Sequence, residues 1–432
     1  MKGFNSDDRR ISVIGLGYVG LPLSLLLAKN YKITGLDTDR NKIEKLRSRV
    51  APISEPGISE LMSDSVVADR IEFTFDTADL KETTIKIITV GTPYDPAADY
   101  IDYSQLNGAL DLLEGKLKQG DILVLKSTVP PGTTNSIVRN RIESFGFRVP
   151  EDIGMAFSPE RIVEGQAIKD FTSLPKIVGA SDPETLAVVS EIIGSLGGSI
   201  IQVSNIETAE MVKMVDNYSR YVFLGLTNEI ALISEKVGVD VLELIKAAKQ
   251  YYPRNAGLLI PGPGVGGSCL NKDPFILKAD IRKRSLDLRM VNAASEVNRS
   301  IPKHIADLVM QFSNGRKKVV IAGVAFKGDT DDTRFTPTFE IVDILSSKEY
   351  QVKLSDPFVE LPNTTINHDL YESLKDNDIL LLLTDHSKYK DLDLLRLKSV
   401  MNDDPLIIDT RGIISRDEAE SLSLEYHGYG RL

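Results

Sequence analysis

Residues 11–20 read ISVIGLGYVG, and this stretch decides the fold of the first part of the chain. A short apolar run leads into Gly15-x-Gly17-x-x-Gly20, and an apolar stretch suited to a helix follows. In this fingerprint the first glycine permits a tight turn, the second lets the backbone approach a pyrophosphate, and the third lets the helix pack on the strand. The pyrophosphate would lie at the positive end of that helix. The stretch therefore predicts a strand–turn–helix unit that binds a dinucleotide.

The next apolar run ends at Asp37, which selects between dinucleotides. A carboxylate about twenty residues after the fingerprint accepts a hydrogen bond from a ribose 2′-hydroxyl and disfavours a 2′-phosphate. A glycine fingerprint alone is common and is often an ordinary turn. Its combination with Asp37 indicates a cofactor site, and NAD is expected rather than NADP.

Apolar runs and helical stretches alternate through the first 203 residues, with strand candidates at 85–90, 122–126 and 153–156. Such alternation predicts a parallel sheet with crossover helices. One long helix is expected over 207–237, because apolar residues recur there at helical spacing without proline. The glycine-rich loop 261–267 precedes another helical stretch to roughly 311.

After the turn signal at Asn314–Gly315, strand-like runs return at 318–323, 351–354, 379–383 and 406–408. The fold class is therefore α/β, with two Rossmann-like parallel-sheet domains joined by a long central helix and a helical dimerisation region. The expected domains are residues 1–203, 204–312 and 313–432.

Composition excludes several classes of protein. A chain of 432 residues is too long for one ordinary core. Its net charge of −11 argues against a nucleic-acid partner. No apolar run approaches the about 20 residues that span a bilayer, and no signal core precedes the first strand, so neither membrane insertion nor export is expected. One cysteine fits the reducing cytoplasm, and four histidines without a Cys/His cluster predict no metal site.

Cys269 lies in the loop PGPGVGGSCLNKD, residues 261–273. A lone cysteine is most often a small buried hydrophobe. Here the glycines would let a ligand approach the backbone, and Lys272 would favour the thiolate. Asp273 would share a helix face with Cys269 if a helix starts there. These features favour a nucleophile.

Lys213 and Asn217 are four residues apart on the expected long helix and lie on one face of it. A solvated polar stripe is the alternative. The helix is expected to be largely buried, because the neighbours are apolar: Met211, Val212, Met214 and Val215. A buried lysine beside an amide would stabilise an oxyanion.

Glu160 and Arg161 follow a strand at the carboxyl edge of the sheet, where ligands of such sheets bind. Glu160 is either a general base or a carboxylate that balances a helix dipole. In the last part of the chain, residues 319–328 read VVIAGVAFKG, a strand and turn without the final glycine spacing of the fingerprint. Lys327 stands where a phosphate would lie, which indicates a mononucleotide or UDP-type site, and Arg334 and Arg411 add cations nearby.

At these residues the chain resembles the UDP-glucose/GDP-mannose dehydrogenase family. The resemblance runs through nearly the whole chain in family order. Its motifs are GLGYVGLP (15–22), GTP (91–93), STVPPGTT (127–134), PER (159–161), the helix with Lys213 and Asn217, GVGGSCLNKD (264–273) and AFKGDTDDTR (325–334).

The resemblance implies an NAD-dependent four-electron oxidation of the C6 primary alcohol of a UDP-sugar to the uronic acid. Cys269 would capture the aldehyde as a thiohemiacetal, and the second oxidation would leave a thioester for water to hydrolyse. By the same resemblance, Lys213 and Asn217 stabilise the oxyanion, Asp273 orients or activates water or the lysine, Glu160 is the base for hydrolysis, and Thr128 positions water.

The ligand contacts are also implied by the resemblance. The residues expected at NAD are Gly15, Gly17, Tyr18, Val19, Gly20, Asp37, Lys42, Thr92, Ser127, Thr128, Glu164, Lys272 and Arg334. Those expected at the UDP-sugar are Glu160, Arg161, Lys213, Asn217, Arg254, Gly264, Gly266, Phe326, Lys327 and Arg411. A homodimer through the long helix is implied, in which Arg254 reaches the partner's site.

Three short motifs bear on the identity of the sugar. Arg161 resembles members that act on UDP-N-acetylhexosamines, and residues 163–168 resemble the UDP-N-acetylmannosamine branch while staying close to the UDP-glucose pattern. The Asn-Lys-Asp273 ending of the cysteine loop is UDP-glucose-like. UDP-N-acetyl-D-mannosamine is the expected substrate, with UDP-glucose and other UDP-N-acetylhexosamines as alternatives.

Two rival interpretations exist. A 3-hydroxyacid dehydrogenase also joins a Rossmann domain to a long helix with Lys and Asn, but it would need neither Cys269 nor residues 318–432. A catalytically silent nucleotide-sugar sensor would be expected to lose Cys269, Lys213 or Asp273, and all three are present.

Overall fold

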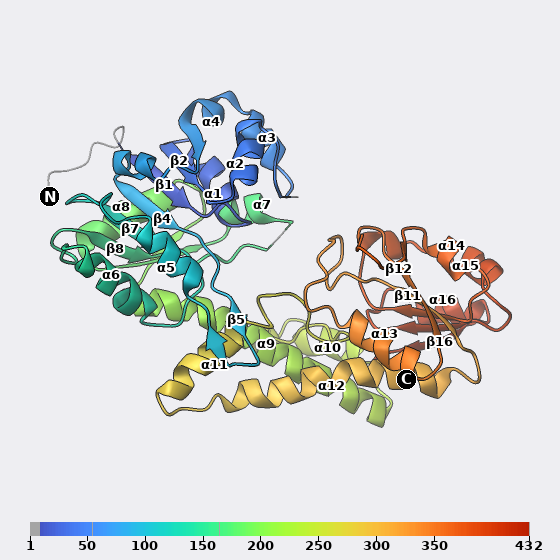
Figure 1. Cartoon of the computed structure of the whole chain (residues 1–432). Helices are drawn as coiled ribbons and strands as arrows, with labels where there is room; N and C mark the ends of the chain where they lie inside the picture. Colours follow the sequence, from blue (N-terminus) through green and yellow to red (C-terminus); the bar gives the residue numbers. More distant parts are fainter. Residues whose placement is uncertain (1–8, 54, 164, 432) are drawn as a thin grey trace. The chain divides into compact units, whose positions relative to one another are not determined.

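The computed structural model describes residues 9–53, 55–163 and 165–431. The chain divides into two compact units, Met1–Asp216 and Asn217–Leu432, coloured blue to green and green to red in Figure 1. The expected domain boundaries after residues 203 and 312 are a finer division, which stays a prediction.

Within the described residues, the first unit is built on an eight-stranded sheet in the order β10-β9-β8-β7-β4-β1-β2-β3. Its central strands are buried along their whole length because both faces are covered, as is typical of parallel sheets. The strands are β1 (Arg10–Ile14), β2 (Lys32–Leu36), β3 (Ile71–Thr74), β4 (Ile85–Ile88), β7 (Ile122–Leu125), β8 (Gly154–Phe157), β9 (Lys176–Ala180) and β10 (Ile200–Gln202).

Alternate residues of one strand enter opposite cores. In β7, Ile122 and Val124 belong to the apolar cluster on one side of the sheet, and Leu123 and Leu125 to the cluster on the other. The helices of this unit are α1 (Gly20–Leu27), α2 (Arg40–Arg47), α3 (Ile58–Ser63), α4 (Ser65–Arg70), α5 (Ser104–Asp111), α6 (Arg139–Ser144), α7 (Ala167–Ser173) and α8 (Pro183–Gly194).

One strand pair departs from the expected parallel sheet. β9 runs antiparallel to β8, with Ala156 opposite Ala180, and β10 pairs parallel with β9. Apolar patterning reports burial and not direction, because direction depends on the path of the segment that joins two strands. The parallel arrangement is confirmed for the pairs from β8 across to β3.

The long helix is confirmed as α9 (Ile206–Val237), which contains the division between the two units. The expectation that it is largely buried is wrong. Met214 is fully buried, whereas Met211 and Val215 are 37% and 42% exposed. The helical period turns these two side chains away from the face that carries Ala209 and Asn217.

The described part of the second unit holds a six-stranded parallel sheet in the order β13-β12-β11-β14-β15-β16. Its strands are β11 (Lys318–Ala322), β12 (Gln351–Ser355), β13 (Ile366–Asn367), β14 (Ile379–Leu382), β15 (Leu406–Asp409) and β16 (Glu425–Gly428). Its helices besides the end of α9 are α10 (Val241–Lys249), α11 (Asp273–Lys283), α12 (Arg289–Phe312), α13 (Thr338–Ser347), α14 (Leu370–Leu374), α15 (Leu394–Val400) and α16 (Arg416–Ser421).

The helical stretch expected up to residue 311 is two helices, α11 and α12. They are separated at Ser285, whose φ of 63° lies outside the right-handed helical region. Across residues 9–53, 55–163 and 165–431, no helix is both long and apolar enough to cross a membrane.

Candidate active site

The glycine fingerprint forms the turn between β1 and α1. Gly15 has φ 97°, and a Cβ on Gly20 would lie 1.8 Å from the Gly15 carbonyl oxygen, so only glycine fits there. A Cβ on Gly17 would meet no atom within 4 Å. Position 17 therefore faces open space, as a backbone that receives a pyrophosphate requires. Tyr18 is exposed and Val19 is half-buried at the start of α1.

Asp37 follows β2 directly and reaches back to the glycine turn. Its Oδ2 accepts hydrogen bonds from the Leu16 amide at 2.9 Å and from Lys42 Nζ at 2.7 Å. Burial raises the pKa of Asp37, but the hydrogen bond from Lys42 and those from the amides of Asp39 and Leu16 outweigh burial and hold it below its ordinary value. Lys42, which is expected near the adenosine ribose, thus contacts Asp37, the carboxylate that is expected to bind that ribose.

Three polar residues gather where the neighbouring strands β4 and β7 end. Ser127 Oγ donates to the Val90 carbonyl at 2.6 Å, and Thr92 Oγ1 donates to the Thr128 carbonyl at 2.5 Å. Ser127 and Thr92 are buried and Thr128 is half-buried. The structure therefore brings these expected site residues together at the carboxyl edge of the sheet.

Glu160 follows β8 at the same edge and is paired with a lysine that no sequence motif marks. Its Oε2 lies 3.2 Å from Lys126 Nζ, and Lys126 also donates to the Ser158 carbonyl at 3.0 Å. A lysine directly after an apolar strand is the only signal for this pair. Glu160 does not balance a helix dipole, because the next helix, α7, begins at Ala167.

The start of α7 is capped by a different carboxylate. Glu55 accepts from the amides of Gly165 and Ala167, both at 2.7 Å. Arg161 contacts Asp216 at 3.4 Å and donates to the Pro175 carbonyl. Glu164, expected at NAD, lies outside the described residues.

The buried amide of Asn217 is held by a buried carboxylate. Asn217 Nδ2 donates to Asp273 Oδ2 at 2.6 Å, and Lys272 Nζ lies 3.7 Å from Asp273 Oδ1. Lys213 is half-buried one turn earlier on α9. Asp273 therefore connects the start of α11 to the helix that carries both Lys213 and Asn217.

Cys269 is exposed, so the interpretation as a small buried hydrophobe is wrong. The condition for a shared helix face with Asp273 is not met, because α11 begins at Asp273 and Cys269 lies in the preceding turn. Pro274 lies in the first turn of the helix, where its missing N–H has no partner to lose. The Asp273 amide still donates to the Cys269 carbonyl at 2.8 Å, which ties the turn to the helix.

The glycines of the cysteine loop lie against side chains of the same unit. A Cβ on Gly266 would lie 2.2 Å from Phe326 Cβ, and one on Gly262 would lie 2.4 Å from Arg411 Nη1. Gly264 has φ 135°. Phe326 and Arg411, both expected at the substrate, are therefore brought against this loop.

The remaining expected cations lie as follows. The Gly267 amide donates to the Arg334 carbonyl at 2.8 Å, and the Arg334 guanidinium is paired with Asp332. Lys327 is half-buried. Arg254, in the 3-10 turn Pro253–Asn255, contacts the hydroxyl of Tyr252 at 3.3 Å. In the described part of the chain, no group of three or more His, Cys, Asp and Glu side chains is placed to hold a metal ion.

Three segments of the chain match domains of one protein family. Residues 9–196 match the NAD binding domain of the UDP-glucose/GDP-mannose dehydrogenase family, residues 207–300 its central domain, and residues 320–416 its UDP binding domain. The chain belongs to this family. It is an NAD-dependent nucleotide-sugar dehydrogenase, and its glycine turn, with open space at Gly17 and Asp37 behind it, fits NAD.

Individual dehydrogenases of the family are similar over their full length. The UDP-N-acetyl-D-mannosamine dehydrogenase of Methanococcus aeolicus is 30% identical over 100% of this chain and 98% of its own. The UDP-glucose 6-dehydrogenase of Rickettsia bellii is 31% identical over 97% and 99%. The solved UDP-D-ManNAc dehydrogenase from Pyrococcus horikoshii superimposes with a TM-score of 0.88 at 31% identity, covering 98% of this chain and 99% of that one.

Proposed function

We propose that this dehydrogenase oxidises C6 of UDP-N-acetyl-D-mannosamine by four electrons, which yields UDP-N-acetyl-D-mannosaminuronate. The observation that carries the chemistry is the exposed Cys269 turn tied to Asp273, whose carboxylate is bonded to Asn217. The relatives named for UDP-N-acetyl-D-mannosamine support the choice of sugar. UDP-glucose and other UDP-N-acetylhexosamines are the alternatives, since a UDP-glucose relative is as similar.

The first oxidation removes a hydride and a proton from the C6 alcohol and leaves an aldehyde. The Cys269 thiolate adds to the aldehyde carbon, and the oxygen takes up a proton to complete the thiohemiacetal. The second oxidation removes a hydride from C6 and the hydroxyl proton, which leaves a thioester. Water then cleaves the C–S bond, and the thiol is released with the acid. NAD supplies the hydride acceptor for both oxidations.

Lys213 and Asn217 stabilise the negative charge on the C6 oxygen in this scheme. One hydrogen of the Asn217 amide is committed to Asp273, which orients the group so that its second hydrogen can face the substrate oxygen. Because Asp273 also starts α11 directly after the Cys269 turn, it couples the position of the nucleophile to that of the amide. It is proposed to orient or activate water or Lys213.

Glu160 is proposed as the base that activates the hydrolytic water, which Thr128 positions. Its ion pair with the buried Lys126 holds the carboxylate at the edge of the sheet. Arg161, Arg254, Gly264, Gly266, Phe326, Lys327 and Arg411 are the further residues proposed to hold the UDP-sugar.

The protein is further proposed to form a homodimer through α9, with Arg254 reaching the partner's site. Apolar side chains on the exposed side of α9 support this, among them Leu226 and Ile233, which are 43% and 54% exposed. A free cysteine that acts as nucleophile suits a reducing compartment, and the cytoplasm is the proposed location.

The proposed activity is tested by following NADH absorbance with a panel of sugars: UDP-ManNAc, UDP-glucose, UDP-GlcNAc, UDP-GalNAc and GDP-mannose. Two NADH per UDP-ManNAc are expected. One NADH per substrate would support the 3-hydroxyacid type of enzyme, and none with any sugar would support a sensor. A higher kcat/KM for another sugar would correct the substrate while leaving the reaction class intact.

A further inference from the structure

Asp356 in the second sheet occupies the position that corresponds to Asp37 in the first sheet. Its carboxylate has different partners. Asp356 follows β12, which pairs with β11 as β2 pairs with β1. Asp37 keeps 11% of its side chain exposed, whereas Asp356 is completely buried. Asp356 therefore has no surface on which to receive a ribose.

Backbone amides and one imidazole surround the Asp356 carboxylate. Its Oδ2 accepts from the amides of Val324 and Ala325 at 2.7 and 3.0 Å, and lies 3.0 Å from His386 Nε2. Its Oδ1 accepts from the amides of Phe358 and Val359 at 2.9 and 3.1 Å. Burial raises the pKa of Asp356, but the hydrogen bonds from His386 and from these amides outweigh it and hold the pKa below its ordinary value.

His386, which is also completely buried, connects this carboxylate to the other end of the loop formed by residues 324–329. Its Nδ1 accepts from the Asp329 amide at 3.0 Å, so the proton of the ring is on Nε2 and points to Asp356. The Asp329 carboxylate in turn accepts from the amide and hydroxyl of Ser387 at 2.8 and 2.5 Å. One imidazole thus joins both flanks of residues 324–329.

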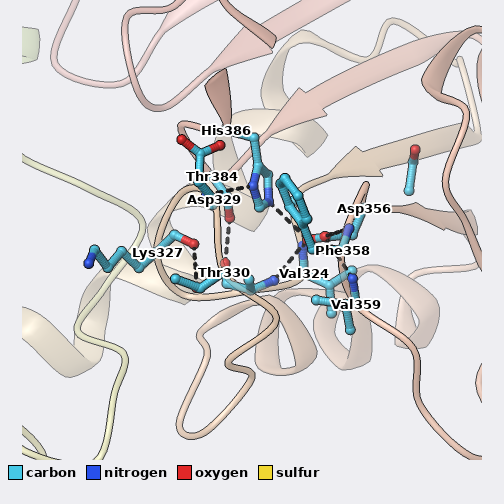
Figure 2. A network of polar contacts seen from close by, with 12 residues as sticks. Val324, Lys327, Asp329, Thr330, Asp356, Phe358, Val359, Thr384 and His386 are labelled. Atoms are coloured by element: carbon cyan, nitrogen blue, oxygen red, sulfur yellow. Dashed lines mark hydrogen bonds and ion pairs between the residues drawn. The ribbon is translucent and has the colours of Figure 1, made fainter. Parts of the chain in front are cut away.

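Between these two flanks lie Phe326 and Lys327. Figure 2 shows the Lys327 side chain extending away from His386 and Asp356, which contact one another. Thr384 Oγ1 donates to the Ala325 carbonyl at 2.5 Å, and a Cβ on Gly328 would lie 2.5 Å from the Asp385 carbonyl oxygen. The loop therefore has little freedom to move relative to the residues after β14.

We propose that Asp356 and His386 form a clamp that positions Phe326 and Lys327 to bind the UDP part of the substrate. The inference rests on the proposed UDP-sugar substrate. The carboxylate position that receives a ribose in the first sheet is used in the second to hold the loop that receives a phosphate. His386 and Asp356 are positioning residues, because they act through the loop and their own polar atoms are used inside the protein.

The test compares two variants of the full chain that differ in hydrogen bonding. His386→Leu removes both the donor and the acceptor, whereas the amide of His386→Gln offers one of each. His386→Leu is expected to weaken binding of UDP alone about tenfold, which corresponds to about one hydrogen bond's net free energy. The KM for the UDP-sugar should rise with it, kcat should change less, and the affinity for NAD should stay unchanged. His386→Gln should restore most of the UDP affinity.

Asp378→Asn is the matched control for loss of stability. Asp378 accepts from the amides of Lys317 and Lys318 at 3.0 and 2.9 Å. These residues lie at the amino ends of β14 and β11, away from the loop 324–329 at the carboxyl ends. This variant should lower the melting temperature and leave UDP affinity unchanged. A milder variant, Ser387→Ala, removes only the hydroxyl bond to Asp329 and should weaken UDP binding about two- to threefold, as one peripheral hydrogen bond allows.

The clamp is contradicted if His386→Leu, or Ser387→Ala where His386→Leu does not fold, binds UDP like the wild type. It is equally contradicted if Asp378→Asn weakens UDP binding as much as His386→Leu does. Absence of UDP binding by the wild-type chain would instead refute the proposed substrate, and the clamp with it.

Discussion

Cys269, the proposed nucleophile, lies exposed in a turn that Asp273 ties to α11, so its sulfur is accessible to a ligand. Cys269→Ser should keep NAD affinity and lose the full oxidation by several orders of magnitude, because a hydroxyl gives up its proton far less readily than a thiol. Steady-state NADH formation and NAD titration measure the two effects. Ser268→Ala, which removes a hydroxyl 4.0 Å from the sulfur, is the control and should stay near wild type. Near-normal turnover of Cys269→Ser to the acid would remove the covalent mechanism.

Glu160 is predicted to act after the second hydride has left. Glu160→Gln should therefore still show a burst of two NADH per active site, while release of the acid slows by about 10²–10⁴-fold, the range for a lost general base. The variant should accumulate a sugar thioester on Cys269, which intact-protein mass spectrometry after an acid quench detects. Glu55→Gln, whose carboxylate only caps α7, is the control. With neither a burst nor an adduct, Glu160 would be assigned to substrate binding or hydride transfer instead.

Asp37 should make the enzyme prefer NAD, because a 2′-phosphate would meet its negative charge. Asp37→Asn should reduce the preference for NAD over NADP, because it removes that negative charge. Lys42 Nζ, which lies 2.7 Å from the Asp37 carboxylate in the wild type, would then be available to attract the 2′-phosphate. The ratio of kcat/KM for NAD to that for NADP measures this, with the exposed cap residue Asp39→Asn as the control. Equal values for the two cofactors in the wild type would contradict the assignment.

Helix α9 is tied to the loop after β7 by Glu210, which no motif marks although it lies one turn before Lys213. Its two oxygens accept from the Gly132 amide at 2.5 Å and from the amide and hydroxyl of Thr134 at 2.8 and 2.6 Å. This loop leads directly from Thr128. Burial raises the pKa of Glu210 to about 7 in spite of these donors. The tie therefore holds α9 against the segment that is expected to position water.

The raised pKa of Glu210 predicts how stability depends on pH. The folded protein holds this proton more tightly than the unfolded chain, so the stabilisation is complete below the unfolded value of 4.5 and is lost as pH rises through about 7. The loss is on the order of 3 kcal/mol. Glu210→Gln should flatten this part of the profile, as measured by urea unfolding between pH 4.5 and 7.5. Glu72→Gln, at an exposed position of β3, is the control and should keep the slope. Parallel profiles for Glu210→Gln and the wild type would contradict this prediction.

At the scale of the whole molecule, the exposed apolar side of α9 predicts the oligomeric state. The wild type should be a dimer by light scattering, and a double variant, Leu226→Asp with Ile233→Asp, should be monomeric. Charges placed on a symmetric apolar interface are desolvated in both copies at once. Leu395→Asp, on an exposed position of α15, should remain dimeric. A monomeric wild type, or a double variant that stays dimeric, would contradict the interface.

The sequence by itself determined those features that depend on neighbours along the chain. Gly15 is needed for its φ of 97°, and Gly20 because a Cβ would collide with the Gly15 carbonyl of the same turn. Helix α9 follows from apolar residues at helical spacing. Apolar runs likewise predicted the central strands of both sheets. The candidate site was found because the glycine turn, the cysteine loop and the Lys213–Asn217 pair are all local patterns.

Only the tertiary structure decided which distant residues meet. Asp356 and His386 are separated by two strands, and Lys126 reaches Glu160 from the end of a different strand, so neither pair leaves a local signal. The direction of β9 and the exposed side of α9 depend in the same way on what packs against them. The physical reason is that burial and hydrogen bonding of a side chain depend on the path of the whole chain, whereas turn sterics and periodicity act over a few residues.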